Sequence, residues 1–187
     1  MKKSFGPQTY LPATPVLLVG TYDKEGKPNL MTAAWGGICC SNPVCMTVSL
    51  RKATYSYSGI VERKAFTLGV PSQSQVKEAD YMGIVSGAKV DKFAEAGYHA
   101  AKGDFVDAPY AEEIPLVVEC ELVESLELGL HTMFVGKVMD VKADGSVLAE
   151  DGLPDVSRIK PIVYDPIHKI YSGLGESLGK GFSVGGK

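Results

Sequence analysis

Residues 44–51 alternate between apolar and polar side chains, which is the two-residue repeat of a β-strand with one buried face. The apolar set is Met46, Val48 and Leu50, and the polar set is Thr47, Ser49 and Arg51. Strands of this kind are typical of antiparallel sheets that cover a core on one side. The chain is therefore predicted to be mainly β, with a core on one face of this strand and ligand contacts on the other.

Several other short segments have the composition of strands and are separated by turn residues. Loop 23–27 and the Asn42-Pro43 turn divide the first of them, and Gly129 divides the last long pair. Between Val118, Cys120 and Leu122, we expect Glu119 and Glu121 to face solvent. The predicted strands are Pro15–Tyr22, Asn29–Cys40, Val44–Arg51, Ala65–Val70, Leu116–Leu126, Leu130–Lys142 and Ile162–Tyr171.

Helices are predicted at the periphery. Thr54 can cap a helix that runs to about Lys64, and Ser72 or Ser74 can begin a second one. Residues 91–96 form a further helical turn inside an excursion at about 72–115. Strands joined largely by hairpins, with helices between them, predict one antiparallel barrel domain over residues 1–187 with helices packed outside it.

Composition is that of a globular protein, with 187 residues, 45% hydrophobic and 22% charged. No apolar run approaches the length of a membrane span, and no signal-like core follows the N-terminus, so we expect a cytoplasmic protein that does not bind membranes. Residues 1–64 hold eight Lys or Arg against three Asp or Glu. This excess is too small for a nucleic-acid surface but suits one bound anion.

Small side chains precede a group of hydrogen-bond donors and positive charges. Thr32, Ala33 and Ala34 would let a flat ligand approach the backbone. Downstream, Ser49, Arg51, Lys52 and Thr54 supply donors. The first amides of a helix that begins near Thr54 lack internal partners and favour an anion, and Arg51 adds a forked donor. Together these features predict a site for a phosphorylated aromatic cofactor.

The order and spacing of six segments resemble the flavin reductase-like family, in particular its flavoredoxin branch. The resemblance spans residues 10–175 and implies a split β-barrel of the Greek-key type that binds FMN, usually across a homodimer interface. The segments are Asn29-x-x-Thr32-Ala33-Ala34-Trp35, Ser41-Asn42-Pro43, Ser49-Leu50-Arg51-Lys52-Ala53-Thr54-Tyr55, Glu62-Arg63-Lys64-Ala65-Phe66-Thr67, Ser86-Gly87 with Asp91-Lys92-Phe93, and His131-Thr132-Met133-Phe134-Val135-Gly136-x-Val138.

The resemblance also implies roles for individual residues. It places Thr32, Ala33, Ala34 and Trp35 beside the isoalloxazine ring, and Ser49, Leu50 and Arg51 along the ring edge and ribityl chain. Asn29 would be a further cofactor-binding residue. It places Thr54 and Tyr55 at the phosphate. It places Ser86, Lys92 and Phe93 on a segment that covers the flavin. His131 would lie near the flavin and an incoming nicotinamide. No residue is assigned as a catalytic acid or base.

Each of these residues also has a structural interpretation. Thr32, Ala33 and Ala34 could be small strand residues beneath a packed helix, and Trp35 could belong to the core. Arg51 could be solvated, and His131 could be a structural strand residue. Adjacent Cys39 and Cys40 seldom bond to each other, so we expect them to pack as small apolar residues. Cys45 and Cys120 lie in no C-x-x-C motif, and the three histidines are scattered, so no metal site is predicted.

The predicted function is that of an FMN-binding oxidoreductase of the flavin reductase type, with NADH or NADPH as a possible electron donor. A non-enzymatic flavoprotein that carries electrons between redox protein partners is the alternative. A split barrel for haem or a pyridoxal derivative is a third. The glycine-rich tail at 173–181 does not have phosphate-loop spacing, so a nicotinamide would have to stack on the flavin.

Overall fold

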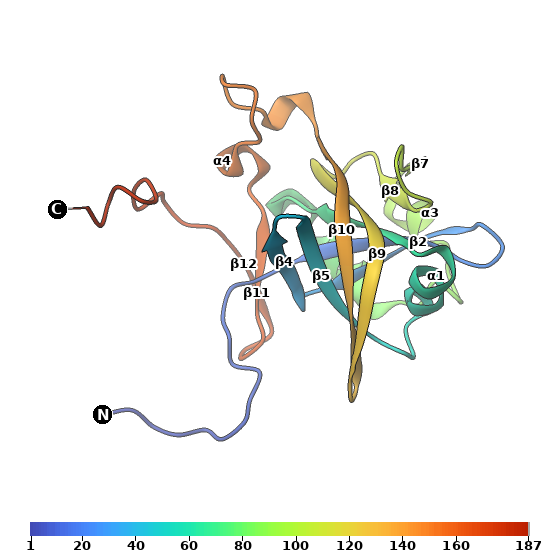
Figure 1. Cartoon of the computed structure of the whole chain (residues 1–187), viewed down its shortest axis with the longest axis horizontal. Coiled ribbons are helices and arrows are strands. Elements are labelled where there is room, and N and C mark those ends of the chain that lie inside the picture. Colours follow the sequence, from blue (N-terminus) through green and yellow to red (C-terminus); the bar gives the residue numbers. More distant parts are fainter. Residues whose placement is uncertain (187) are drawn as a thin grey trace.

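The computed structural model describes residues 1–186 and contains short helices around an antiparallel sheet (Figure 1). No helix within this range is long and apolar enough to cross a membrane. The strands are β1 (Thr14–Pro15), β2 (Leu17–Tyr22), β3 (Pro28–Ala33), β4 (Gly36–Ser41), β5 (Val44–Arg51), β6 (Ala65–Val70), β7 (Ala100–Lys102), β8 (Pro109–Ala111), β9 (Leu116–Leu128), β10 (His131–Ala143), β11 (Ile162–Asp165) and β12 (Ile170–Gly173). The helices are α1 (Tyr55–Arg63), η1 (Gln73–Gln75), α2 (Val76–Ile84), α3 (Lys92–Ala96), η2 (Gly145–Val147) and α4 (Val156–Ile159).

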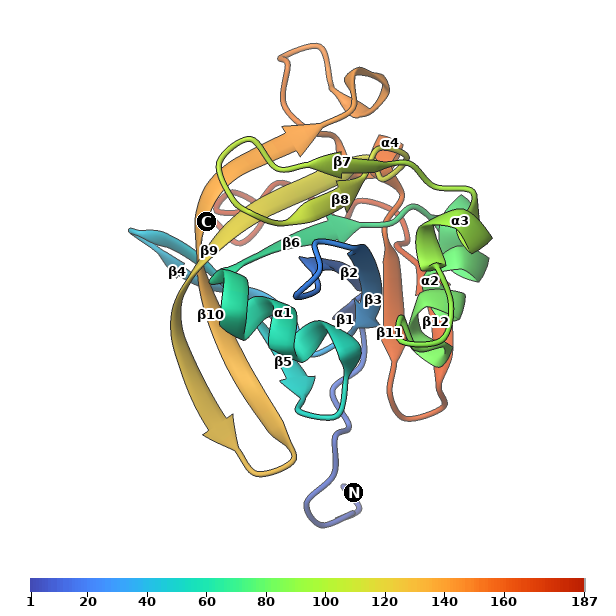
Figure 2. The ribbon, with the colours of Figure 1, turned by 90° about the vertical axis from the view of Figure 1, so that its right-hand side faces the viewer.

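Seven strands form the main sheet in the order β3-β2-β6-β9-β10-β5-β4, and every ladder in it is antiparallel. Strands β3 and β4 lie at opposite edges of this order, yet only Ala34 and Trp35 separate them in the chain. So short a link spans at most about 11 Å. The sheet must therefore curl until its edges meet, which is the geometry of a split barrel, and Figure 2 shows β9 and β10 curving around it.

The core has two layers because β2 is covered on both faces. Leu17 and Val19 face the inside of the curled sheet, where they pack with Phe66 and Phe134. Leu18 faces the opposite way. The outer layer is closed by side chains from α2, α3 and β11, among them Ala79, Met82, Phe93 and Ile162. Burial on both faces explains why residues 16–19 form a continuous apolar run rather than an alternating one.

The predicted alternation of residues 44–51 is confirmed. Val48 and Leu50 are buried in the inner core, Met46 packs against it, and Thr47, Ser49 and Arg51 are on the other face. The predicted helix from Thr54 to about Lys64 is also confirmed as α1. Ser72 begins the second helical segment through a capping box with Gln75.

Two predicted strands are wrong in extent because each contains a change of direction. Residues 29–40 form β3 and β4, which cross from one sheet edge to the other at Ala34 and Trp35. Residues 162–171 form the hairpin β11–β12, which pairs with β1. The excursion at 72–115 contains the hairpin β7–β8 as well as the helices α2 and α3.

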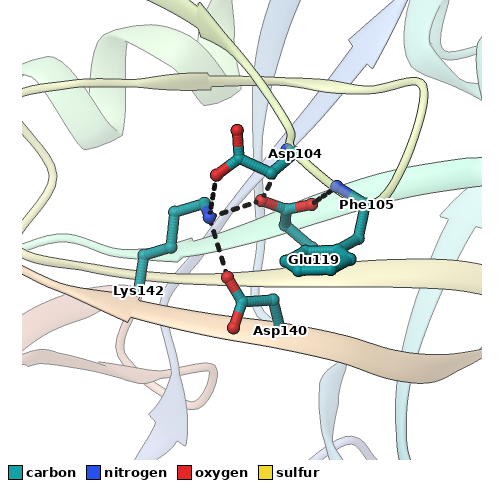
Figure 3. Close-up of polar contacts among 5 residues, drawn as sticks. All are labelled: Asp104, Phe105, Glu119, Asp140 and Lys142. Carbon is teal, nitrogen blue, oxygen red and sulfur yellow. Dashed lines mark hydrogen bonds and ion pairs between the residues drawn. The ribbon is translucent and has the colours of Figure 1, made fainter.

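Glu119 does not face solvent as predicted, whereas Glu121 does. The Glu119 side chain is 0% exposed because the segment after β7 covers it. Its carboxylate accepts hydrogen bonds from the backbone N–H groups of Asp104 (3.1 Å) and Phe105 (2.8 Å) and lies 3.1 Å from Lys142 Nζ (Figure 3). Lys142 also donates to the Asp104 and Asp140 carboxylates, and these bonds raise its pKa. The cluster fixes the loop to the sheet.

Candidate cofactor site

Three hollows lie along β3 and the crossing from β3 to β4. The first has a volume of about 210 Å³ and lies between the N-terminal end of α1 and the segment that follows α2. Five predicted residues line it, namely Asn29, Thr54, Tyr55, Ser86 and Lys92. These residues come from β3, the start of α1, the loop after α2 and the first residue of α3, so the fold brings together groups that are up to 63 positions apart in the chain.

The N-terminus of α1 opens into this first cavity. Thr54 has extended backbone at the N-cap, but its hydroxyl donates to the Arg51 carbonyl (2.8 Å) and makes no hydrogen bond to the helix amides. The predicted side-chain cap is therefore absent from α1, although the helix begins where expected. The first amides of a helix have no partners within it, and the positive end of the helix dipole favours a negative group. The cavity thus has an anion-binding end.

Lys92 supplies the positive charge in this cavity. Its side chain is 4% exposed, and its ammonium donates to the Met82 carbonyl at 2.7 Å. Burial lowers the pKa of Lys92 to about 8. A backbone carbonyl only partly compensates a buried ammonium, so an anionic ligand beside Lys92 would be held by a charge-assisted bond.

Asn29, Gly87 and Tyr55 form a closely packed wall of the same cavity. Asn29 is 3% exposed and donates from Nδ2 to Ser56 Oγ at 2.8 Å. A side chain at Gly87 would clash, since an added Cβ would lie 2.1 Å from Asn29 Oδ1 and 2.7 Å from Tyr55 Cδ1. The Tyr55 hydroxyl donates to Asp23 at 2.6 Å, and this bond, with burial, raises its pKa to about 12. Tyr55 is therefore a neutral, fixed wall residue.

The second hollow, of about 360 Å³, shares Gly83 and Ile84 with the first and contains Thr32 and Ala34. The Thr32 hydroxyl donates to the Ala79 carbonyl of α2, so a helix does pack over this part of β3. An added Cβ at Gly83 would lie 3.3 Å from Thr32 Cβ. Thr32 thus serves helix packing and still borders a space large enough for part of a ligand.

The third hollow, of about 460 Å³, contains Trp35, Ser49 and His131, together with Leu128 and the N-terminal segment Gln8–Leu11. The Ser49 amide donates to the Trp35 carbonyl at 2.8 Å, which ties the crossing point to β5. Trp35 and His131 are both partly exposed here and do not lie in either core cluster. The indole of Trp35 and the imidazole of His131 therefore both line this hollow.

The remaining predicted site residues are placed differently. Ala33, Leu50 and Phe93 are 8%, 1% and 5% exposed and point into the core clusters, so only their backbone groups could face a ligand. Arg51 is exposed at the end of β5, opposite His131 in the β5–β10 register, and lines none of the three hollows.

Sequence reasoning missed several lining residues. The second hollow includes Asp80, Tyr164, Lys169 and Tyr171, and the Tyr171 hydroxyl donates to Asp80 at 3.0 Å. Burial and this bond raise the pKa of Tyr171 to about 12. The rings of Tyr164 and Tyr171 contact each other across the β11–β12 hairpin in a tilted arrangement, with 5.4 Å between their centroids. Tyr164 and Tyr171 are opposite each other in the β11–β12 hairpin. The sequence would have indicated this pair only if residues 162–171 had been predicted as a hairpin rather than as one strand.

Two of the three histidines serve surface contacts. His99 pairs with Glu113 at 2.6 Å and His168 with Asp165 at 2.8 Å, which leaves His131 as the histidine that borders a hollow. Over residues 1–186, no three His, Cys, Asp or Glu side chains meet in a way that could hold a metal ion. The chemistry that the site offers is recognition of an anion beside a flat apolar surface.

Comparison with known proteins gives consistent matches over nearly the whole chain. The structure resembles that of a flavoredoxin from Desulfovibrio vulgaris (Miyazaki F), with a TM-score of 0.95, 50% identity and 100% of both chains covered. It also resembles a flavoredoxin from Methanosarcina acetivorans, with a TM-score of 0.89, 32% identity, and 99% and 96% of the two chains covered. An uncharacterized protein of Archaeoglobus fulgidus is 31% identical over 131 residues, which are 70% of this chain and 73% of the relative.

The family model described as "Flavin reductase like domain" matches residues 10–168. This range contains β2 to β11, the crossing at Ala34 and Trp35, and the cavity at the start of α1. The chain therefore belongs to the flavin reductase-like family.

Proposed function

We propose that this protein is an FMN-binding oxidoreductase that transfers electrons through the bound flavin. A bound flavin supplies the redox chemistry, because it accepts a hydride or single electrons, and the protein supplies position and electrostatics. Support comes from family membership and from the resemblance to two proteins named flavoredoxin. A carrier that exchanges electrons only with protein partners is the second candidate.

The observation that carries the proposal is the donor set of the first cavity. A phosphate group is bound by several hydrogen-bond donors and a positive charge. The α1 N-terminus and the buried Lys92 ammonium provide both in one cavity of about 210 Å³. The exclusion of a side chain at Gly87 keeps backbone close to this space. These residues fit the phosphate of FMN.

The flat ring of FMN would extend from this cavity toward the crossing at Ala34 and Trp35. The second hollow adjoins the first through Gly83 and Ile84, and Ala34 lies on its wall, followed in the chain by Trp35 on the wall of the third. A methyl side chain at Ala34 lets a ring approach the backbone. We infer that Trp35, Ser49 and His131 orient one edge of the ring.

A second flat reactant would enter the third hollow. It is open beside Trp35 and His131 and has an apolar wall that includes Leu128. We propose that a nicotinamide from NADH or NADPH stacks there when the protein acts as a reductase. Rapid mixing of the FMN-loaded protein with each nucleotide tests this: fast loss of flavin absorbance supports the reductase, whereas reduction only by a reduced protein donor supports the carrier.

We further propose a homodimer with the flavin near its interface. The hairpin β9–β10 projects from the body of the molecule (Figure 1) and exposes the apolar residues Val123, Leu126, Leu128 and Leu130 at 50% to 63% of their surfaces. Several exposed apolar side chains at the end of a projecting hairpin are typical of a protein interface. Because Leu128 also borders the third hollow, a partner on this hairpin would lie beside the site.

Calorimetric titration of the full chain with FMN tests the proposed function. We expect Lys92→Met to weaken binding roughly 10- to 150-fold, because a charge-assisted bond contributes about 1.5–3 kcal/mol. Lys89→Met is the matched control, since Lys89 is exposed three residues away and lines no part of the cavity. It should bind FMN as the unmodified protein does.

Two results would contradict this proposal at different levels. If the folded protein does not bind FMN, the proposed function is wrong. If it binds FMN but Lys92→Met and Lys89→Met have the same affinity as the unmodified chain, the function stands and the phosphate position is wrong.

A further inference from the structure

Three of the four cysteines lie together on one hairpin, away from the residues assigned to the cofactor. Cys39 and Cys40 are on β4, Cys45 is on β5, and all four thiols of the chain, including Cys120, are free. Strand β4 is an edge strand of the main sheet, so its outer side is open to solvent. No step proposed for the flavin uses these thiols.

The register places Cys40 directly opposite Cys45. Ile38 pairs with Met46 and Cys40 with Cys45, so Cys39 is the extra residue of a β-bulge. Directly opposed residues of antiparallel strands have side chains on the same face and Cα atoms about 4.5–5.5 Å apart. Disulfides bridge Cα separations of about 4.4–6.8 Å, which include this range.

The exposure of Cys40 and Cys45 suits a pair in which one thiol reacts with a solvent-borne disulfide and the other then closes the protein disulfide. Cys39 and Cys40 are exposed and do not pack as small apolar residues as predicted, whereas Cys45 is 7% exposed. By contrast, Cys120 is 0% exposed in the inner core, and burial raises its pKa to about 12. The neighbouring Cys39 has a raised pKa because of desolvation and the nearby Cys45 and Cys40, which reduces its thiolate fraction.

We propose that Cys40 and Cys45 form a redox-active dithiol that closes into a cross-strand disulfide. The oxidant is a low-molecular-weight disulfide. The Cys40 thiolate attacks one of its sulfurs, which forms a mixed disulfide and releases one small thiolate. The Cys45 thiolate then attacks Cys40 Sγ, which forms the protein disulfide and releases the second small thiolate. The two protein thiols lose two electrons and two protons, and the small disulfide becomes two thiols.

The two strands that hold the cysteine pair also extend to the third hollow, where we place the edge of the flavin ring. The same two strands are joined at their other end by the Ser49–Trp35 backbone hydrogen bond, beside the third hollow. A covalent link at Cys40 and Cys45 would hold the far end of the hairpin, including the exposed Ile38 and Val44. Oxidation should therefore slow amide hydrogen exchange along β4, where an edge strand otherwise exchanges readily.

Oxidation of the full, flavin-loaded chain by glutathione disulfide tests the proposal. We expect a loss of about 2 Da in the intact protein and the loss of two alkylatable thiols. Trypsin leaves all three cysteines of the hairpin in one peptide, because no Lys or Arg that it can cleave lies between Glu25 and Arg51, so variants must identify the pair. Cys40→Ser and Cys45→Ser should each abolish the loss of mass, and Cys39→Ser is the matched control that should retain it.

The outcomes separate cleanly and do not depend on whether the flavin assignment is right. Formation of the bond in Cys39→Ser, with its absence in the other two variants, supports the pair. If all variants stay reduced at every ratio of glutathione disulfide to glutathione, or if Cys40→Ser still forms an internal disulfide, the proposal is overturned. A mixed disulfide that accumulates in Cys45→Ser but not in Cys40→Ser would show that Cys40 is the attacking thiol, and one that accumulates in Cys40→Ser would contradict it.

Discussion

At the scale of single residues, Lys92 is held in surroundings that solvate its charge poorly. Its side chain is 4% exposed, and burial lowers its pKa from 10.5 to about 8. Between these two pH values the unfolded chain binds the proton and the folded chain does not, so stability falls as the pH is lowered from 10.5 to 8. Below pH 8 the full penalty is present. This lysine therefore lowers the stability of the ligand-free protein at neutral pH.

We expect Lys92→Met to stabilise the ligand-free protein at pH 7 by about 1–3 kcal/mol, even though it weakens FMN binding. The gain should disappear near pH 10.5, where the unfolded chain also loses the proton. Urea unfolding of both proteins at pH 7 and pH 10.5 measures it. A variant that is less stable than the unmodified chain at pH 7 would mean that Lys92 is a structural residue rather than a ligand-binding one.

The affinity for FMN should also depend on pH through the same residue. As the pH rises through about 8, the free protein loses the Lys92 charge that a phosphate would contact. We expect the dissociation constant to rise about tenfold between pH 7 and pH 9.5, and to stay constant over this range in Lys92→Met. Fluorescence titration of the flavin at several pH values provides the measurement, and parallel curves for the two proteins would contradict the assignment.

The sequence could indicate which residues gather at the site but not which of their neighbours point into the core. Asn29, Thr54, Tyr55, Ser86 and Lys92 do line one cavity. Lys92 lines this cavity from the start of α3, inside the excursion, and its ammonium donates to the Met82 carbonyl at the end of α2. Phe93 follows Lys92 directly but points into the core, so adjacency in the chain did not imply a shared role.

At the scale of elements, Glu119 shows why an alternating pattern is incomplete information. Its strand β9 alternates as expected, but the loop after β7 returns over the outer face and buries the carboxylate. A one-dimensional pattern contains no record of what a distant loop covers. The same limit explains the single predicted strand 29–40, since its apolar and small residues continue through Ala34 and Trp35, and the turn signal Gly36-Gly37 comes only after the crossing.

Removal of the Glu119 carboxylate should release this loop. We expect Glu119→Ala to destabilise the protein by about 3–5 kcal/mol, because two backbone N–H groups and Lys142 lose a buried acceptor. Glu119→Gln, which keeps an acceptor oxygen, should cost less. Chemical denaturation gives both values, and equal effects of the two variants would show that shape rather than charge holds the loop.

At the scale of the whole molecule, the exposed end of the β9–β10 hairpin should control assembly. We expect Leu126→Glu combined with Leu130→Glu to convert a dimer into a monomer in sedimentation experiments and to weaken FMN binding, because the hairpin borders the third hollow. Val141→Glu is the control, since Val141 is 51% exposed near the opposite end of β10. An unmodified protein that sediments as a monomer would remove the dimer from the proposal.

The two-residue link at Ala34 and Trp35 also determines how this molecule should come apart. A protease cut in the loop 23–27 would leave the β2–β3 ladder intact, because six residue pairs hold those strands together. A cut between Ala34 and Trp35 would instead free both margins of the curled sheet at once. We therefore expect a cut at that single peptide bond to unroll the sheet, whereas a cut in the loop 23–27 should leave it folded.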